Sequence, residues 1–132
     1  MRTFSLGAGA DVVKVTTAGN SYADVDTIAN FKAGGADVIV LGSNTKAATA
    51  VNDITSSVGN SNYSNVEAVL TALGTASAFT AGLGNVDYFV WNGDTYIVAA
   101  TANNSFATNT DYLVKLTGTG YNLAKEDIFA NA

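Results

Sequence analysis

The chain has 132 residues, of which 48% are hydrophobic and only 13% are charged, about half the usual charged share. This length suits one domain with a modest core. The net charge is −5 and the six basic residues are scattered singly, so nucleic acid is not an expected partner. The absence of cysteine and histidine excludes disulfides, zinc–thiolate sites and imidazole bases, and leaves Asp, Asn and backbone carbonyls as ligands for a hard cation.

The amino end carries no visible targeting segment, because "MRTFSLGAGADVV" has one positive charge and no apolar run of the needed length. No window is long and apolar enough for a membrane span. Met1 stands directly before strand-like sequence, which suggests a fragment excised from a longer protein. We expect a single domain over residues 1–132.

Residues 3–42 read as short strands and glycine turns. The runs "DVVKV" and "DVIVL" are rich in β-branched residues, and each is entered through glycine. Between them we expect a turn at 18–21, within a stretch rich in Asp and Asn. Residues 43–62 are small and polar, and are typical of a loop or a weak strand.

The segment "NYSNVEAVLTALGTA" changes to a helical period and predicts one short helix over about 64–73. Ser64 is the expected N-cap, Glu67 completes a capping box, and Gly74 is the expected C′ stop. One apolar face follows from the i, i+3, i+4, i+7 spacing of Val66, Val69, Leu70 and Leu73.

The last third of the chain reads as strands again. "VDYFVWNGDTYIVAA" predicts two strands joined by a type I′ turn at Asn92-Gly93, and "DYLVKLTG" over 111–118 predicts a third strand that pairs with 96–100. The fold class is therefore all-β: a β-roll or β-sandwich of short strands with one short helix. Its expected parts are 3–42 (strands and turns), 43–85 (loop and helix) and 86–132 (terminal hairpin and strands).

Two stretches, "LGAGADVVK" and "KAGGADVIV", place glycines just ahead of an aspartate and a strand. They match degenerate copies of G-G-x-G-x-D-x-U-x, the repeat that binds calcium in RTX (repeats-in-toxin) proteins. Glycines permit a tight turn whose carbonyl oxygens point inward, and the aspartate supplies negative charge for a hard cation. The alternative for each stretch is an ordinary turn, capped by its own aspartate.

Longer segments carry a more specific resemblance. "DVDTIANFKAGGADVIVLGS" resembles the segment that closes the calcium-binding β-roll in RTX proteins and serralysin-type secreted proteases, with the pattern D-x-I-x-(D/N)-F followed by G-x-D-x-I-x-L. The positions that fall on the pattern are Asp26, Ile28, Asn30, Phe31, Asp37, Ile39 and Leu41. The hairpin, the strand "DYLVKLTG" and the terminal "EDIF" resemble the end of the same proteins.

This resemblance implies a C-terminal module of a larger secreted or bacterial cell-surface protein, exported by a type I secretion apparatus through a signal in the C-terminal tail. Calcium is the implied cofactor, since clustered carboxylates repel one another until a cation neutralises them. The expected metal ligands are Gly7, Gly9, Asp11, Asp24, Asp26, Asn30, Gly34, Gly35 and Asp37. The tail from Glu126 to Phe129 is either the end of the export signal, an edge strand completing the sheet, or both.

Two other functions stay open. The abundance of Thr, Ala, Asn and Gly also resembles bacterial surface-layer and adhesin-like proteins, which implies a structural domain that associates with itself. A carbohydrate-binding β-sandwich would use the hairpin aromatics, whose ordinary role is cross-strand packing: Tyr88, Phe89, Trp91 and Tyr96. An enzyme is not expected, because the neighbouring carboxylate pairs imply no pocket.

Overall fold

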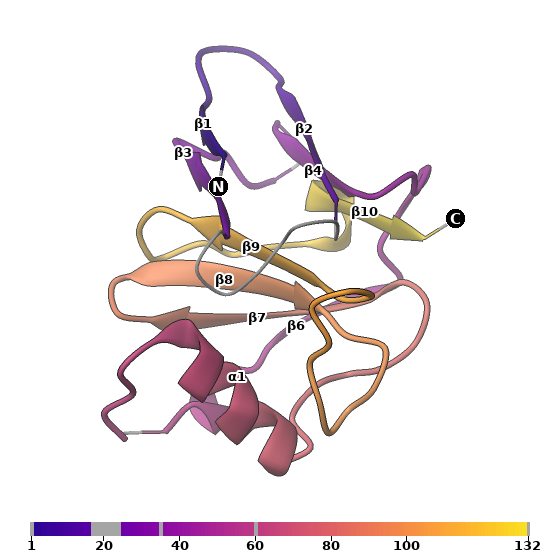
Figure 1. Cartoon of the computed structure of the whole chain (residues 1–132). Coiled ribbons are helices and arrows are strands. Elements are labelled where there is room, and N and C mark those ends of the chain that lie inside the picture. The colour runs from indigo at the N-terminus through magenta and orange to yellow at the C-terminus, as the bar shows by residue number, and fades with distance from the viewer. Residues whose placement is uncertain (1, 17–24, 35, 60, 132) are drawn as a thin grey trace.

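Figure 1 shows the computed structural model of the chain, in which residues 2–16, 25–34, 36–59 and 61–131 are described. These residues form ten strands, one α-helix and two short 3-10 helices. The strands are β1 (Thr3–Ser5), β2 (Val12–Val15), β3 (Asp26–Ala29), β4 (Val38–Leu41), β5 (Lys46–Ala47), β6 (Ala50–Asp53), β7 (Asn85–Trp91), β8 (Asp94–Ala99), β9 (Tyr112–Leu116) and β10 (Ile128–Asn131). The helices are η1 (Thr55–Ser57), α1 (Val66–Thr75) and η2 (Lys125–Asp127). The expectation of a mostly β fold with one short helix is confirmed.

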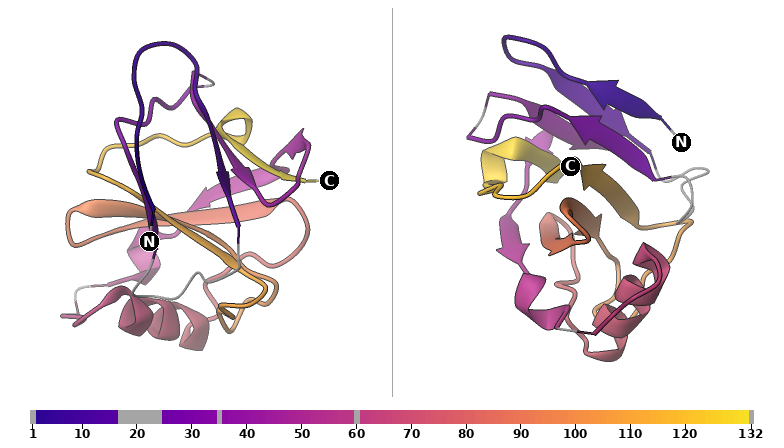
Figure 2. Two further views of the ribbon diagram at one scale, coloured as in Figure 1. Left: turned by 45° about the horizontal axis from the view of Figure 1, so that its top comes forward. Right: turned by 90° about the vertical axis from the view of Figure 1, so that its left-hand side faces the viewer.

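The strands make two sheets. The larger has six strands in the order β1-β3-β9-β8-β7-β6, and the smaller has four in the order β2-β4-β10-β5. Figures 1 and 2 show β1 and β2 at one end of the molecule and α1 at the other. The segment 43–62, expected to be a loop or a weak strand, contributes the short strands β5 and β6. The turn expected at 18–21 lies outside the described residues.

Three segments of the chain repeat one arrangement, in which a strand of the larger sheet is followed by a turn and a strand of the smaller sheet. We call them unit 1 (residues 3–15), unit 2 (26–41) and unit 3 (112–131). Their first strands, β1, β3 and β9, pair in parallel, and so do their second strands, β2, β4 and β10. Units 1 and 2 are the two stretches with similar sequences, and their parallel pairing gives that similarity a structural meaning.

The larger sheet is apolar on both faces because successive side chains of a strand point to opposite sides. In β9, Val114 and Leu116 join a core that includes Val13 and Ile39 of the smaller sheet. Leu113, which precedes Val114 and points to the opposite face, joins a second core that includes the apolar face of α1. The four helix residues predicted to form this face are all buried.

The helix begins one residue later than the sequence predicts. Asn65 is the N-cap, and its side-chain oxygen accepts a hydrogen bond from the backbone N–H of Ala68 at 2.9 Å. The prediction of Ser64 as the cap is therefore wrong, although both residue types are good caps. Gly74 is also not the stop: it lies inside the helix, where an added Cβ would come within 2.8 Å of the Asn104 carbonyl oxygen. Close packing of α1 on the 102–105 loop is the reason for this glycine.

The terminal hairpin follows the sequence prediction. Asn92 and Gly93 have φ angles of 52° and 82°, as a type I′ turn requires, and they join β7 to β8. Strand β9 pairs antiparallel with β8, also as predicted. The C-terminal strand β10 lies between β4 and β5, so it is an inner strand and not the edge strand considered from the sequence.

The cap of α1 gives a direct test of this structure. We expect Asn65→Ala to lower the free energy of unfolding by about 1 kcal/mol, because the Ala68 N–H loses its acceptor. The matched variant Ser64→Ala should have an effect within about 0.5 kcal/mol, since its exposed side chain does not cap the helix. Urea unfolding measures both; a larger loss for Ser64→Ala than for Asn65→Ala would contradict the cap assignment.

Candidate functional site

The glycine–aspartate stretches become two neighbouring turns, which we call the paired turns: turn 1 (residues 6–11) and turn 2 (residues 30–37). Pairing of β1 with β3 and of β2 with β4 places them side by side. Two polar contacts join them: the Lys32 Nζ donates to the Gly7 carbonyl oxygen (2.9 Å), and the Asp11 N–H donates to the Asp37 Oδ1 (2.9 Å). A third contact, from the Asn30 Nδ2 to the Ser5 Oγ (3.3 Å), links turn 2 to the end of β1. The structure therefore brings four predicted ligand residues together: Gly7, Asp11, Asn30 and Asp37.

Asp37 is completely buried, and both of its carboxylate oxygens accept backbone hydrogen bonds. Oδ1 accepts from the N–H of Asp11 in turn 1, and Oδ2 accepts from the N–H of Lys32 in turn 2, each at 2.9 Å. The Asp37 N–H in turn donates to the Lys32 carbonyl oxygen at 3.1 Å. A carboxylate held by backbone donors fixes the shape of turn 2 and ties it to turn 1.

Asp11 occupies the corresponding place in turn 1, directly before the second strand of its unit. Its Oδ2 atom is buried, and no hydrogen-bond partner lies within reach among the described residues. A buried polar atom without a partner costs about 1–3 kcal/mol. This oxygen is therefore a candidate position for a cation or a hydrogen-bond donor.

The glycines of the paired turns supply unusual backbone conformations and exposed carbonyl groups. Gly9 and Gly34 both have a φ angle of 89°, which residues with a side chain rarely adopt. The Gly7 carbonyl oxygen accepts from the Lys32 ammonium group, so a cation of the protein already contacts one predicted calcium ligand. Gly35 lies outside the described residues.

Asp26 is placed apart from the paired turns, at the opposite end of β3. The four residues of this strand span roughly 13 Å, which separates Asp26 from Asn30. Its carboxylate accepts the Arg2 guanidinium, with Nη2 at 2.8 Å and Nε at 3.2 Å, and also the Arg2 backbone N–H at 3.0 Å. This contact raises the pKa of the Arg2 guanidinium. Asp24, another predicted ligand, lies outside the described residues.

Metal-ligand chemistry at the paired turns rests on few charged groups. Among residues 2–16, 25–34, 36–59 and 61–131, no cluster of three or more Asp, Glu, His or Cys residues is placed to hold a metal ion. The Asp11 carboxylate and the backbone carbonyls of turn 1 are oxygen ligands of the kind that a hard cation binds. Calcium accepts such oxygen ligands in irregular geometry, so the residues present are chemically suited to it.

Three further aspartates, which the sequence did not indicate as ligands, are buried: Asp87, Asp111 and Asp127. Asp111 accepts the N–H groups of Thr101 and Ala107, at 2.9 and 2.7 Å. Asp127 accepts the N–H of Ala124 at 2.8 Å. Asp111 and Asp127, like Asp11 and Asp37, directly precede a strand, so the pattern of an aspartate before an apolar strand could have indicated this role.

Asp87 differs from Asp37, Asp111 and Asp127 because it lies inside a strand, β7. Its oxygens accept from the Thr80 N–H at 2.6 Å and from the Asn52 Nδ2 at 3.3 Å. Burial raises the pKa of its carboxyl group above the ordinary 3.8, and the hydrogen bonds from Thr80 and Asn52 oppose this rise.

The hairpin aromatics face the protein interior. The rings of Phe89 and Tyr96 are stacked with centroids 5.4 Å apart, and both side chains are buried with Tyr88. Trp91 is half-buried and lies tilted against Tyr96. These contacts are those of cross-strand packing, and they leave Trp91 as the only one of the four with appreciable exposure.

No helix in the described part of the chain has the length and apolar character needed to cross a membrane. No family model matches the chain, and no curated protein shows significant similarity to its sequence.

The environment of Asp87 predicts a pH dependence. Because its pKa is raised in the folded chain, the folded chain binds the proton more tightly, and stability falls as pH rises from 3.8 through the folded pKa. We expect Asp87→Asn to remove this part of the fall. Urea unfolding of wild type and variant between about pH 3 and pH 7 measures the difference.

The double variant Asn52→Asp/Asp87→Asn is the matched control, because it keeps one carboxylate and one amide in the same buried pair. It should recover a fall in stability over the same pH range. A difference between wild type and Asp87→Asn that is constant with pH would refute the assignment.

Proposed function

We propose that this chain is a calcium-dependent folding and export module of a larger secreted or bacterial cell-surface protein. The observation that carries the proposal is the buried Oδ2 atom of Asp11, which has no hydrogen-bond partner among the described residues and lies in a glycine turn beside a second glycine–aspartate turn. The module has no proposed enzymatic activity. Its partners are calcium ions and a type I secretion apparatus.

The calcium proposal follows from the electrostatics of the paired turns. Asp11 and Asp37 lie in adjacent units, and only Asp37 has both of its oxygens satisfied by backbone donors. A cation at Asp11 would convert a buried, unsatisfied oxygen into a ligand, so that binding free energy adds to folding free energy. Asn30 in turn 2 offers an uncharged oxygen for the same purpose. Asp24, Asp26, Gly34 and Gly35 remain proposed ligands with less geometric support.

The finer description of the fold, a β-roll, is also a proposal. The parallel pairing of three strand–turn–strand units in both sheets supports it, because a roll is built by stacking such units. Unit 3 departs from the repeat, since its turn spans residues 117–127 and has no glycine–aspartate pair of the kind in turns 1 and 2.

Burial of the C-terminal tail constrains when an export signal there can be read. Asp127 and Ile128 are completely buried, and β10 pairs with a strand on each side. A secretion apparatus therefore has access to these residues only in the unfolded chain. Folding driven by calcium outside the cell would keep the tail available during export, which makes the calcium and export proposals mutually consistent.

Self-assembly in a surface layer or adhesin is the second candidate. It is favoured by one observation: β1 and β2 are the edge strands of the two sheets at the same end of the molecule. Unpaired edge strands are a common route to association between chains. Solution mass as a function of protein and calcium concentration tests this candidate. The buried hairpin aromatics give the carbohydrate-binding alternative no comparable support.

A calcium titration tests the leading proposal. We expect far-UV circular dichroism of the chelated protein to gain β signal cooperatively with calcium and not with magnesium, because the turn offers irregular oxygen ligands. Asp11→Asn should weaken the response. Glu67→Gln removes the same charge at an exposed helix position and should leave the calcium response unchanged. If the chelated domain is already fully folded and calcium does not change its spectrum, both glycine–aspartate stretches are ordinary turns.

Lys32 provides an independent test of where calcium binds. Its ammonium group contacts the Gly7 carbonyl oxygen, so it competes with calcium for a ligand and repels the ion. Lys32→Met should therefore tighten the apparent calcium affinity, by up to about fivefold for an exposed charge. Lys46→Met removes the same charge from β5 and should have a smaller effect. Equal effects of the two variants would place the ion away from turn 1.

A further inference from the structure

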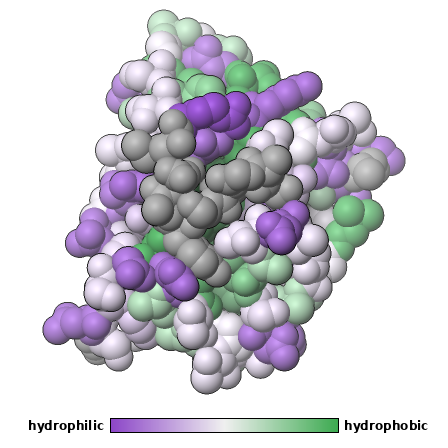
Figure 3. Space-filling view, in the orientation of Figure 1, coloured by the Kyte–Doolittle hydropathy of each residue, from purple (hydrophilic) through white to green (hydrophobic). Residues whose placement is uncertain are grey.

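The turn between β7 and β8 holds the only asparagine of the sequence that is followed by glycine, Asn92-Gly93. It lies at the left-hand edge of the molecule in Figure 1, and Figure 3 shows hydrophilic side chains at this edge. Both residues are exposed, and a Cβ added to Gly93 would meet no atom within 4 Å. Packing therefore leaves this pair of residues open to solvent.

An asparagine followed by glycine can rearrange without an enzyme. The Gly93 nitrogen attacks the Asn92 Cγ and gives up its proton, the side-chain nitrogen leaves as ammonia, and a succinimide ring forms. Water then opens the ring: attack at Cγ gives aspartate, and attack at the main-chain carbonyl carbon gives isoaspartate, whose backbone runs through Cγ. The net reaction exchanges ammonia for water. Glycine favours the first step because it has no side chain to hinder the attack.

The folded turn holds the two reacting atoms apart. The φ angles of Asn92 and Gly93 are 52° and 82°, those of a type I′ turn, in which the first residue has a ψ angle of about +30°. At that ψ angle the Gly93 nitrogen is anti to the Asn92 Cβ about the Cα–C bond, whereas a succinimide ring needs these two atoms to be eclipsed. The reaction therefore requires the turn to open.

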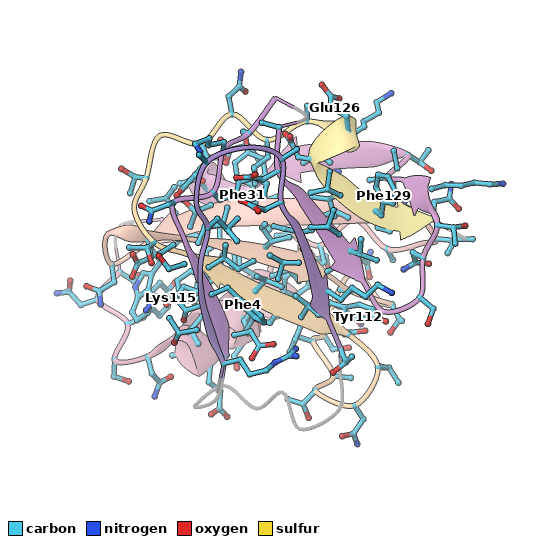
Figure 4. All side chains as sticks on the ribbon, turned by 90° about the horizontal axis from the view of Figure 1, so that it is seen from above. Phe4, Phe31, Tyr112, Lys115, Glu126 and Phe129 are labelled. Atoms are coloured by element: carbon cyan, nitrogen blue, oxygen red, sulfur yellow. The ribbon has the colours of Figure 1, made fainter. Side chains whose placement is uncertain are left out.

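Contacts of the neighbouring residues hold the turn in this conformation. The Asp94 Oδ1 accepts the Gly118 N–H at 2.9 Å, and the Thr95 hydroxyl donates to the Gly118 carbonyl oxygen at 2.9 Å. Asp94 also forms an ion pair with Lys115 (Oδ2 to Nζ, 3.3 Å), which Figure 4 shows on the same side of the molecule as the turn. The protection of Asn92 thus comes from its backbone conformation and not from burial.

We propose that Asn92 is a self-modification site that folding protects. Chains in which the hairpin is not formed convert Asn92 to isoaspartate or aspartate, and folded chains do so only when the turn opens. The inference goes beyond the proposed function, because it concerns every period that the chain spends unfolded and requires neither calcium nor export.

The two products differ in what they do to the fold. Asp-Gly also suits a type I′ turn, so the aspartate product keeps the hairpin. Isoaspartate adds a backbone atom to a loop of only two residues, and the loop fixes the register of a hairpin, so this product does not allow the observed pairing of β7 with β8. That pairing stacks Phe89 on Tyr96 in the core beneath α1. A chain that stays unfolded for long therefore loses the ability to fold.

Ageing the full chain in its folded and unfolded states tests the protection. One sample is kept in calcium-containing buffer and the other in guanidinium chloride at the same mildly alkaline pH. Circular dichroism verifies the state of each, so the comparison does not depend on the calcium proposal. We expect peptide mass spectrometry to show conversion of Asn92 at least about tenfold faster in the unfolded chain. Equal rates in the two samples, or no conversion in denaturant, would overturn the proposal.

A pair of threonine variants tests whether the contacts of the turn give the protection. Thr95→Val removes the hydrogen bond to Gly118, and should speed conversion of Asn92 in the folded protein by about threefold or more. Thr71→Val is the matched control, because it removes the same kind of bond, to the Glu67 carbonyl oxygen, on α1. It should leave the rate unchanged. Equal acceleration by both variants would overturn the assignment of the protection to the turn.

Refolding separates the two products. The chain aged in denaturant is returned to folding conditions, and the folded fraction is recovered by its resistance to protease. This fraction should contain aspartate at position 92 and be depleted of isoaspartate by about tenfold or more, because only the aspartate product fits the turn. The variant Asn92→Asp controls for the added charge and should fold as the wild type does. Recovery of both products in equal yield would contradict the inferred loss of folding.

Discussion

The Asp37 carboxylate is the interaction on which the arrangement of the first two units depends. A buried charge is costly unless strong donors surround it, and here the donors are backbone N–H groups of two different turns. Because both donors are backbone N–H groups, the contact depends on where turns 1 and 2 lie and not on the side chains of the donor residues, Asp11 and Lys32. It sets the register of β2 on β4 and closes turn 2 at the same time. This places the Asp11 carboxylate at the open end of the stack.

Buried aspartates that accept backbone N–H groups occur at other places in the chain, which has few other means of fixing its loops. There is no cysteine and no proline, and only 13% of the residues are charged. Five aspartates are nevertheless buried among the described residues, and backbone N–H groups are bound by each of them: Asp26, Asp37, Asp87, Asp111 and Asp127. Much of the negative charge is therefore inside the protein as cross-links between loops and strands. An acidic residue in this sequence is as much a structural element as a candidate ligand.

This explains which features the sequence could predict. The apolar face of α1 and the Asn92-Gly93 turn depend on residues close together in the chain, and both were predicted correctly. Parallel pairing of β3 with β9 joins segments more than 80 residues apart, and no local pattern encodes it. The cap is Asn65 and not Ser64, and because both residue types are good caps the sequence alone does not distinguish them. For the aspartates, the sequence indicates a carboxylate before a strand, but its partner, a cation or a backbone N–H, depends on which unit lies next to it.

Asp11 links the stability of the module to whatever satisfies its buried carboxylate oxygen. An unsatisfied oxygen costs about 1–3 kcal/mol, a considerable part of the 5–15 kcal/mol that keeps a typical domain folded. A cation bound to the Asp11 carboxylate would remove this cost. Unit 1, with both strands at sheet edges, would then be the last part to become stable, after the inner strands β8, β9 and β10 have enclosed the C-terminal tail.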